Sequence, residues 1–179
     1  PNFNPNFCMQ YIEPIKRSFV GTLLTLSILT PNMSTIAADS KPEQIEWDLT
    51  ELYPNDDAWN DAREGVLSQL DGLKSRKGSL SEGAKQFYAT LQLVSDLQRT
   101  SGRIHAYASL RADEDLRIAP NQEKRQLALQ MYNQLSQAAS WIDPEILKLG
   151  SAKIEAYQKS EPRLAPFAHS LDNTLRNAP

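Results

Sequence analysis

A long stretch without proline is the feature that most restricts the fold of this 179-residue chain. No proline occurs between Pro54 and Pro120. A strand-rich domain of this size would show turn residues about every 8–12 positions. The stretch instead repeats apolar residues at steps of three and four positions, which is the spacing of one helix face. We therefore expect α-helices here.

The interruptions of this pattern set the expected helix ends. Asn55 or Asp56 can cap the first helix, and Gly78 can stop it. Gly102 is the weak point of the second helix, where glycine costs roughly 1 kcal/mol relative to alanine. Amphipathic helices of this length bury their stripes as antiparallel hairpins or a bundle, so the expected fold class is all-α. The expected helices cover about residues 56–76, 81–116, 122–141, 144–149, 151–158 and 166–177.

The first forty residues differ from the rest. Lys16 and Arg17 precede an uncharged, mostly apolar run over residues 18–30, and Pro31 and small residues follow it. This order is typical of a secretory signal peptide, and the run is shorter than the roughly 20 residues of a spanning helix. A short buried helix and an uncleaved membrane anchor are the alternatives. Export predicts a periplasmic or secreted protein.

The expected organisation follows from this order. Residues 1–8 resemble translated upstream sequence, because Met9 is the best internal start. Residues 9–38 form the signal peptide, cleaved after Ala37 or Ala38, residues 39–46 a polar linker, and residues 47–179 a helical domain. Cys8 precedes Met9, so the mature chain would lack cysteine, as suits an oxidising compartment.

Charge and residue counts exclude several classes of site. The net charge of −3 argues against a nucleic-acid partner, which clustered Lys and Arg would bind. One cysteine excludes a disulfide scaffold and a zinc site built from cysteines. Neither His105 nor His169 begins an H-E-x-x-H motif, and we expect both to lie at helix surfaces or in packing contacts. We assign no residue as catalytic, as cofactor-binding or as a metal ligand.

Other polar and aromatic groups are expected to be structural. Arg111 with Asp115, and Asp113 with Arg117, are spaced as ion pairs on one helix face. The run over residues 123–125 (EKR) is expected to be a solvated face. The aromatic residues are mostly core candidates, although some of them could line a peptide-binding wall: Trp47, Tyr53, Trp59, Phe87, Tyr88 and Tyr107.

Two separated stretches are more specific than composition. Residues 47–59 (WDLTELYPNDDAW) and residues 107–117 (YASLRADEDLR) occur in order, with about 50 residues between them. Together with residues 138–149 (AASWIDPEILKL), they resemble the N-terminal region of oligoendopeptidase F, a zinc endopeptidase family related to thimet oligopeptidase. The resemblance covers about residues 45–177.

The resemblance implies a role for the whole domain. Family members are longer, mostly helical enzymes that carry H-E-x-x-H and a further Glu ligand in a C-terminal catalytic domain. They hydrolyse short peptides inside a deep channel, and their N-terminal helices form part of its wall. This chain stops before the catalytic helix, so we expect the helical domain to be truncated there. No zinc ligand of the family can be carried over to a residue of this chain.

The expected function is therefore the N-terminal helical portion of an exported zinc oligoendopeptidase. Its partners would be an oligopeptide substrate and the missing catalytic domain, with no stable membrane anchor after signal cleavage. The 179 residues alone would bind no zinc and cleave nothing. If the missing domain normally covers one face of these helices, the 179 residues would expose an apolar patch above a few hundred Å² and would self-associate or be loosely packed. The alternative is a self-standing, exported, non-catalytic helical module that binds a protein or peptide.

Overall fold

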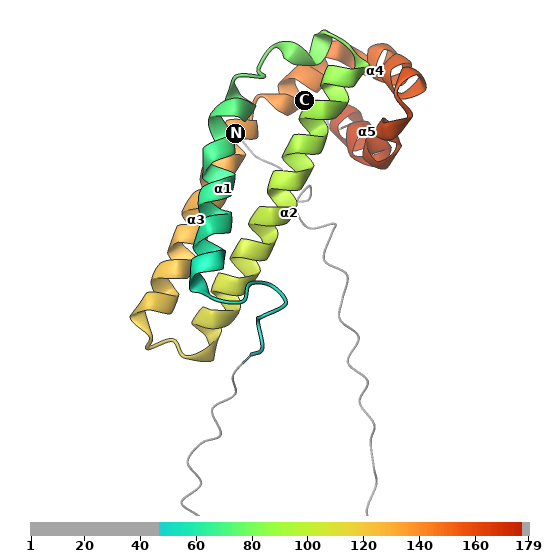
Figure 1. The fold of residues 1–179 in the computed structure, drawn as a ribbon. Helices are drawn as coiled ribbons and strands as arrows, with labels where there is room; N and C mark the ends of the chain where they lie inside the picture. The colour runs from blue at the N-terminus through green and yellow to red at the C-terminus, as the bar shows by residue number, and fades with distance from the viewer. Residues whose placement is uncertain (1–46, 177–179) are drawn as a thin grey trace, which may run out of the picture. The chain divides into compact units, whose positions relative to one another are not determined.

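The computed structural model describes residues 47–176, and Figure 1 shows their helices. The predicted upstream segment, signal peptide and linker all lie outside the described residues. No strand occurs over residues 47–176, so the predicted all-α class is confirmed. The elements are α1 (Asp56–Lys74), η2 (Ser79–Ser81), α2 (Ala84–Glu114), α3 (Ala119–Ala139), α4 (Ile142–Ser160), η3 (Pro162–Phe167) and α5 (Ala168–Arg176), where η marks a 3-10 helix.

Three long helices form an antiparallel bundle. α1, α2 and α3 run alternately up and down, and each of them packs against the other two (Figure 1). Short connections force this arrangement, because consecutive helices joined by a few residues must lie side by side. α4, η3 and α5 pack together near the connection between α1 and α2. α4 and η3 also contact α2. The three-helix bundle therefore has one end joined to α4 and one free end, at the α2–α3 connection.

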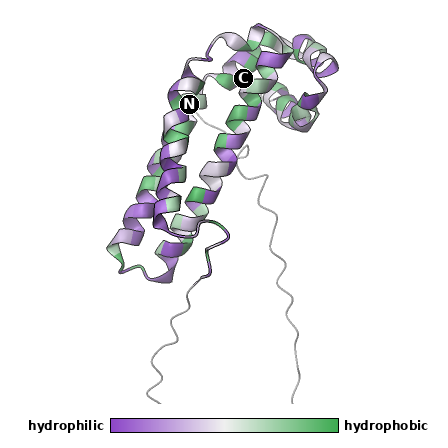
Figure 2. Ribbon diagram, viewed as in Figure 1, coloured by the Kyte–Doolittle hydropathy of each residue, from purple (hydrophilic) through white to green (hydrophobic). Residues whose placement is uncertain are grey.

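The core is formed by the apolar stripes that the helical spacing predicted. Buried residues come from every element and form one cluster. Figure 2 shows hydrophobic and hydrophilic residues alternating along the helices, as expected for amphipathic helices. The predicted stripe positions that are buried include Trp59, Val66, Leu70, Leu73, Phe87, Leu91, Val94, Leu97, Ile104, Tyr107, Met131, Leu135 and Ala138.

Two predictions at the edge of the core are wrong. The second helix was expected to extend to Leu116, but this residue lies outside α2 and is 68% exposed. The reason is that α2 ends at Glu114, so Leu116 lies in the connection to α3. Trp47 was expected in the core and is 42% exposed. Leu129 is 41% exposed on α3, although that helix contacts both α1 and α2.

The helix ends differ from the prediction by a few residues, for local reasons. Asn55 is the cap of α1, and its side-chain oxygen accepts a hydrogen bond from the Ala58 amide at 2.9 Å. α1 ends at Lys74 instead of residue 76, and the chain turns at Gly78, whose φ of +93° favours glycine. α2 begins three residues later than expected, because residues 79–81 form a 3-10 turn.

Proline explains the early start of α3. The helix begins at Ala119 instead of residue 122, and Pro120 lies in its first turn. Proline is tolerated there because its missing N–H would have no partner inside the helix.

The C-terminal helices also differ from the prediction at their boundaries. α4 begins at Ile142 instead of residue 144, so Asp143 lies in its first turn. The predicted break at Gly150 is confirmed, since Gly150 has φ +75° and ψ 165° within α4. The last helix, α5, starts at Ala168 instead of residue 166, because residues 162–167 form the 3-10 helix η3.

Candidate functional site

The segment before α1 lies against the free end of the bundle. We call residues 47–53 the strap. The Trp47 amide donates a hydrogen bond to Glu114 Oε1 at 2.9 Å. Arg103 Nη2 donates to the carbonyl oxygens of Glu51 at 3.1 Å and Leu52 at 3.0 Å. The two stretches that carry the family resemblance therefore touch each other, since the strap belongs to one and Glu114 to the other.

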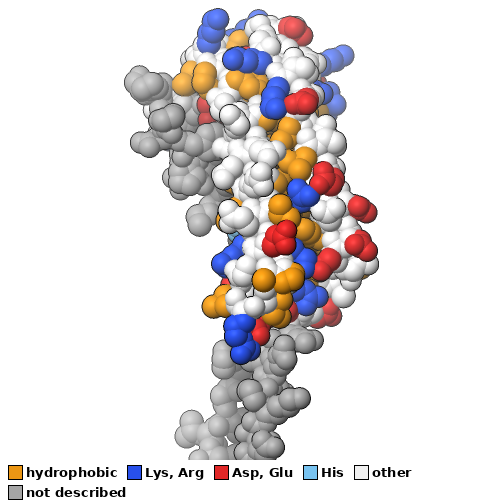
Figure 3. All heavy atoms as spheres, turned by 90° about the vertical axis from the view of Figure 1, so that its left-hand side faces the viewer, with side chains coloured by type: hydrophobic (Ala, Val, Ile, Leu, Met, Phe, Trp, Pro, Cys, Tyr) orange, Lys and Arg blue, Asp and Glu red, His pale blue; other side chains and the backbone are white. Residues whose placement is uncertain are grey.

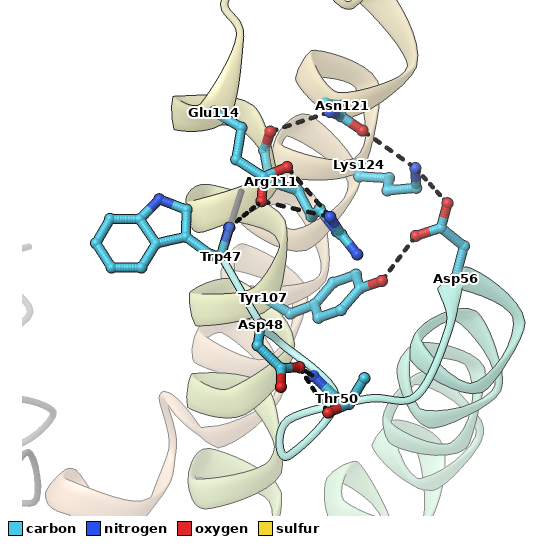
Figure 4. Close-up of polar contacts among 9 residues, drawn as sticks. All are labelled: Trp47, Asp48, Thr50, Asp56, Tyr107, Arg111, Glu114, Asn121 and Lys124. Atoms are coloured by element: carbon cyan, nitrogen blue, oxygen red, sulfur yellow. Dashed lines mark hydrogen bonds and ion pairs between the residues drawn. The ribbon is translucent and has the colours of Figure 1, made fainter. Parts of the chain in front are cut away.

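A polar cluster connects the start of α1 with α2 and α3 (Figure 4). Tyr107 donates its hydroxyl to Asp56 Oδ1 at 3.0 Å. The Lys124 ammonium lies 2.6 Å from Asp56 Oδ2 and 3.4 Å from Asn121 Oδ1. Asp56 is in the first turn of α1, where the helix dipole also favours a carboxylate. One carboxylate thus holds three helices together.

Side chains at the start of α3 cap the C-terminal end of α2. Asn121 Nδ2 donates to the Arg111 carbonyl at 3.0 Å, and Gln122 Nε2 donates to the Ala112 carbonyl at 3.2 Å. The last four carbonyls of a helix have no partner inside that helix, and these amides satisfy two of them. The turn between α2 and α3 is therefore fixed by side chains as well as by its backbone.

Aromatic rings lie directly beneath this polar layer. Tyr107 is 1% exposed, and its ring meets that of Tyr53 edge to face at 5.7 Å and that of Trp59 in a stack at 6.5 Å. Trp59 Nε1 donates to the Ile104 carbonyl at 2.9 Å. The predicted core role of these aromatic residues holds for Trp59, Phe87 and Tyr107, while Tyr53 and Tyr88 are half-buried.

The surroundings shift the pKa values of two cluster residues. Burial acts to raise the pKa of Asp56, but hydrogen bonds from Lys124 and Tyr107 and the nearby positive charges outweigh it and lower that pKa. Burial raises the pKa of Tyr107, and its hydrogen bond to Asp56 acts in the same direction. At neutral pH the cluster therefore contains an ionised aspartate and a neutral tyrosine.

The predicted ion pairs near the end of α2 are wrong. Arg111 pairs with Glu114 at 3.2 Å instead of with Asp115, and Asp113 pairs with Arg125 of α3 at 3.5 Å instead of with Arg117. The expected spacing of four residues requires a helix through residue 117, whereas α2 ends at Glu114.

Asp115 finds a different partner in the turn. Its carboxylate accepts two hydrogen bonds from the Arg117 side chain and one from the Arg117 amide, each at 2.9 Å. The side-chain hydrogen bonds are the main cause that lowers the pKa of Asp115 to about 2. The acidic run over residues 113–115 is thus divided among three separate basic partners.

The predicted solvated face over residues 123–125 is wrong at two positions. Lys124 is 17% exposed in its side chain and pairs with Asp56, and Arg125 pairs with Asp113. Both contacts reach other helices, which the sequence spacing along one helix cannot reveal. Of the three, Glu123 is exposed, while Lys124 and Arg125 are half-buried.

The chain is similar in sequence to oligopeptidases. No family model matches it. The oligopeptidase PepF of Bacillus subtilis is 26% identical over 149 residues, which is 83% of this chain and 22% of that protein. The group B oligopeptidase PepB of Streptococcus agalactiae is 26% identical over 137 residues, 76% of this chain and 23% of that protein. The crystal structure of oligoendopeptidase-F from Enterococcus faecium matches with a TM-score of 0.64 and 29% identity, over 69% of this chain and 24% of that one.

The chain is related to the oligoendopeptidase F family over the matched part of its length. It spans less than a quarter of each of these relatives. The chain thus shares sequence and part of its fold with longer peptidases.

The described residues do not fit the zinc that an oligoendopeptidase F would hold. Over residues 47–176, no three His, Cys, Asp or Glu side chains are gathered as ligands for a metal ion. His105 is half-buried on α2, and His169 is exposed on α5, where its Nε2 lies 3.1 Å from Asn173 Nδ2. No step of peptide hydrolysis can be derived from these residues.

A small hollow of about 180 Å³ lies between α1 and α2. One acidic residue, Asp96, lies at its edge, and the rest of the lining is small, apolar or uncharged: Ala62, Gly65, Val66, Gln69, Leu97 and Thr100. Of the described helices, none has the length and apolar character needed to cross a membrane.

The polar cluster aligns α1, α2 and α3 at the free end. It is the main arrangement of charged groups described here in this relative of oligoendopeptidase F.

Proposed function

We propose that this chain is the N-terminal helical portion of an exported, zinc-dependent oligoendopeptidase that hydrolyses short peptides. The observation that carries this proposal is the agreement of fold and sequence with oligoendopeptidase-F of Enterococcus faecium over 69% of the chain. The related proteins support the same reaction class, because each of them is named as an oligopeptidase or oligoendopeptidase.

The helices would serve as part of the wall of a substrate channel. Long helices locked at their ends are suited to this role, because a rigid wall excludes folded proteins by size. The polar cluster holds the free end of the bundle at Asp56, Tyr107 and Lys124. The zinc ion and its ligands would lie in the part of the enzyme that this chain does not match, since the chain spans about a fifth of PepF.

Export is supported by the order of residues 9–38, in which basic residues, an apolar run and small residues follow one another. We expect the mature protein in the periplasm or outside the cell. N-terminal sequencing of protein recovered from that fraction should read from Ala38 or Asp39. Recovery of the chain only from the cytoplasm, with residues 9–38 attached, would contradict export.

The activity is tested on the complete gene product. We expect the reading frame to continue beyond Pro179 and to encode H-E-x-x-H. The purified full-length protein should cleave a quenched fluorescent peptide of about eight residues, and a chelator should abolish the cleavage reversibly. The 179-residue chain is the matched control and should neither cleave the peptide nor retain zinc after dialysis. A stop codon directly after Pro179 would instead favour the non-catalytic peptide- or protein-binding module.

A further inference from the structure

The strap is held to α2 largely through its main-chain atoms. Glu114 accepts a hydrogen bond from the Trp47 amide, and Arg103 donates to two consecutive strap carbonyls. Main-chain contacts of this kind do not depend on the side chains of the bound segment, as in other modes of peptide recognition. The contacting groups of α2 could therefore hold a peptide other than the strap.

The groups that contact the strap and the cluster follow one face of α2. Arg103, Tyr107, Arg111 and Glu114 are spaced by four, four and three residues, and we call them the α2 ladder. At 1.5 Å per residue the α2 ladder is about 16 Å long, which matches a peptide of six to eight residues with one turn. It carries a donor for carbonyls at one end, Arg103, and an acceptor for amides at the other, Glu114.

Two side chains of the strap add specificity to these main-chain contacts. Leu49 is 5% exposed and belongs to the core cluster. Tyr53 lies edge to face on Tyr107 and places its ring 5.7 Å from the Arg103 guanidinium carbon. A turn links the two side chains, because the Leu52 and Tyr53 amides both donate to the Leu49 carbonyl. The contacts therefore favour an apolar residue followed four positions later by an aromatic one.

The helix that follows the strap has attachments of its own. α1 has its own cap at Asn55, and its buried residues pack against α2 and α3 and not against the strap alone. Four strap residues, Trp47, Asp48, Thr50 and Glu51, are exposed. Segments with few buried contacts open more easily than the core does.

We propose that the α2 ladder is a peptide-binding site that the strap occupies in cis. Its ligands would be short peptides with the strap's pattern of an apolar residue and, four positions on, an aromatic residue. The strap competes with them and acts as an autoinhibitory segment. Binding at the α2 ladder needs no zinc and no catalytic domain. A test of this binding is therefore independent of a test of the proposed peptidase activity.

The test uses the full chain and a probe peptide. The probe is a fluorescein-labelled, N-acetylated peptide of residues 47–54 (WDLTELYP), and its anisotropy reports binding. In the variant Leu49→Ser/Tyr53→Ser the strap is weakened and the α2 ladder is intact. We expect this variant to bind the probe saturably, roughly tenfold or more tightly than the unaltered chain does.

Control variants assign the binding to the α2 ladder. Adding Arg103→Gln to the weakened chain removes two charged hydrogen bonds and should reduce affinity by roughly tenfold or more. Adding Arg99→Gln instead should leave affinity unchanged, because Arg99 is exposed on the same helix and pairs with Asp96. A probe with serine at the Leu and Tyr positions should not bind. Equal binding with and without Arg103→Gln would overturn the proposal.

Hydrogen exchange of the unaltered chain provides a second measurement, which also decides the question if the weakened variant does not fold. The Leu52 and Tyr53 amides should exchange roughly tenfold or more faster than the amides over residues 91–97 of α2. Arg103→Gln should accelerate exchange in the strap and leave α2 unchanged. Strap amides that exchange only with global unfolding would overturn the proposal.

Discussion

The two ends of the three-helix bundle are joined to their neighbours by different interactions. At the free end, charged and polar groups join α1, α2 and α3 around Asp56. At the other end, α4 contacts α2 through the Tyr157 and Phe87 rings, 5.4 Å apart. It also contacts the α1–α2 connection, because the Tyr157 hydroxyl donates to the Ser81 carbonyl at 3.0 Å. The Gly78 amide donates to Glu145 at the same place.

The two ends should therefore contribute differently to the stability of the bundle and to the alignment of its helices. Burying an aromatic side chain contributes several kcal/mol, whereas a half-exposed ion pair contributes about 1 kcal/mol or less. The α4 end should therefore supply more of the free energy of unfolding. The free end should mainly fix which helix faces meet, and it should respond to pH.

The largest effect is expected at the α4 end. Phe87 is fully buried, and Phe87→Ala should lower the free energy of unfolding by about 3–5 kcal/mol, because it leaves a cavity beside Tyr157. Urea unfolding followed by circular dichroism measures this loss. Leu129→Ala, at an exposed position of α3, is the control and should change stability by less than about 0.5 kcal/mol. Similar losses for both variants would contradict the assignment of the core.

A smaller effect is expected from the polar cluster. Tyr107→Phe keeps the buried ring and removes the hydroxyl that donates to Asp56, so it should cost about 1–2 kcal/mol. Tyr53→Phe removes a hydroxyl for which the described residues show no hydrogen bond, and it should cost less than about 0.5 kcal/mol. Equal losses in urea unfolding would show that the hydrogen bond to Asp56 contributes nothing.

The free end should also give the bundle a dependence on acid. The pKa of Asp56 is lowered in the folded chain, so its stabilising contribution is present above the ordinary carboxyl pKa of about 3.9 and is lost as pH falls below it. Asp56→Asn should therefore be less stable than the unaltered chain at pH 7, by at most about 1 kcal/mol, since Asp56 is half-exposed. The difference in melting temperature should shrink towards pH 2. A difference that does not change between pH 7 and pH 2 would disprove this role.

The smallest effect on stability is expected at the tip of the free end. Leu116 is exposed, and Leu116→Ser should change the free energy of unfolding by less than about 0.5 kcal/mol. It should nevertheless reduce self-association, because Trp47, Leu116 and Ile118 are large hydrophobic residues exposed in the strap and in the α2–α3 connection. Figure 3 shows hydrophobic side chains at the surface of one face of the described helices. Sedimentation velocity at increasing concentration measures the change, and unaltered association would exclude Leu116 from the contact.

The sequence predicted those features that depend on one helix at a time. Burial at Leu73, Phe87 and Met131 follows from helical spacing, because these positions recur on one face. The break at Gly150 follows from the backbone freedom of glycine. The relationship to oligoendopeptidase F also rests on local stretches, namely residues 47–59 and 107–117.

The sequence did not predict contacts between different helices. Lys124 reads as a surface residue of its own helix, and it pairs with Asp56 because the start of α1 lies beside α3 in the fold. Arg111 and Asp113 were given the wrong partners, because the end of α2 at Glu114 depends on capping by Asn121 and Gln122. One signal was available: the strap and the end of α2 both lie in the stretches that resemble the family.

The kink at Gly150 has a consequence for residues far from it. Glu145 and Tyr157 are twelve positions apart and would be about 18 Å apart along a straight helix. Their partners Gly78 and Ser81 are three positions apart, within about 10 Å of each other. The bend at Gly150 brings Glu145 and Tyr157, on either side of it, to the same α1–α2 connection. The bend at Gly150 thus lets one helix hydrogen-bond the α1–α2 connection at both Gly78 and Ser81.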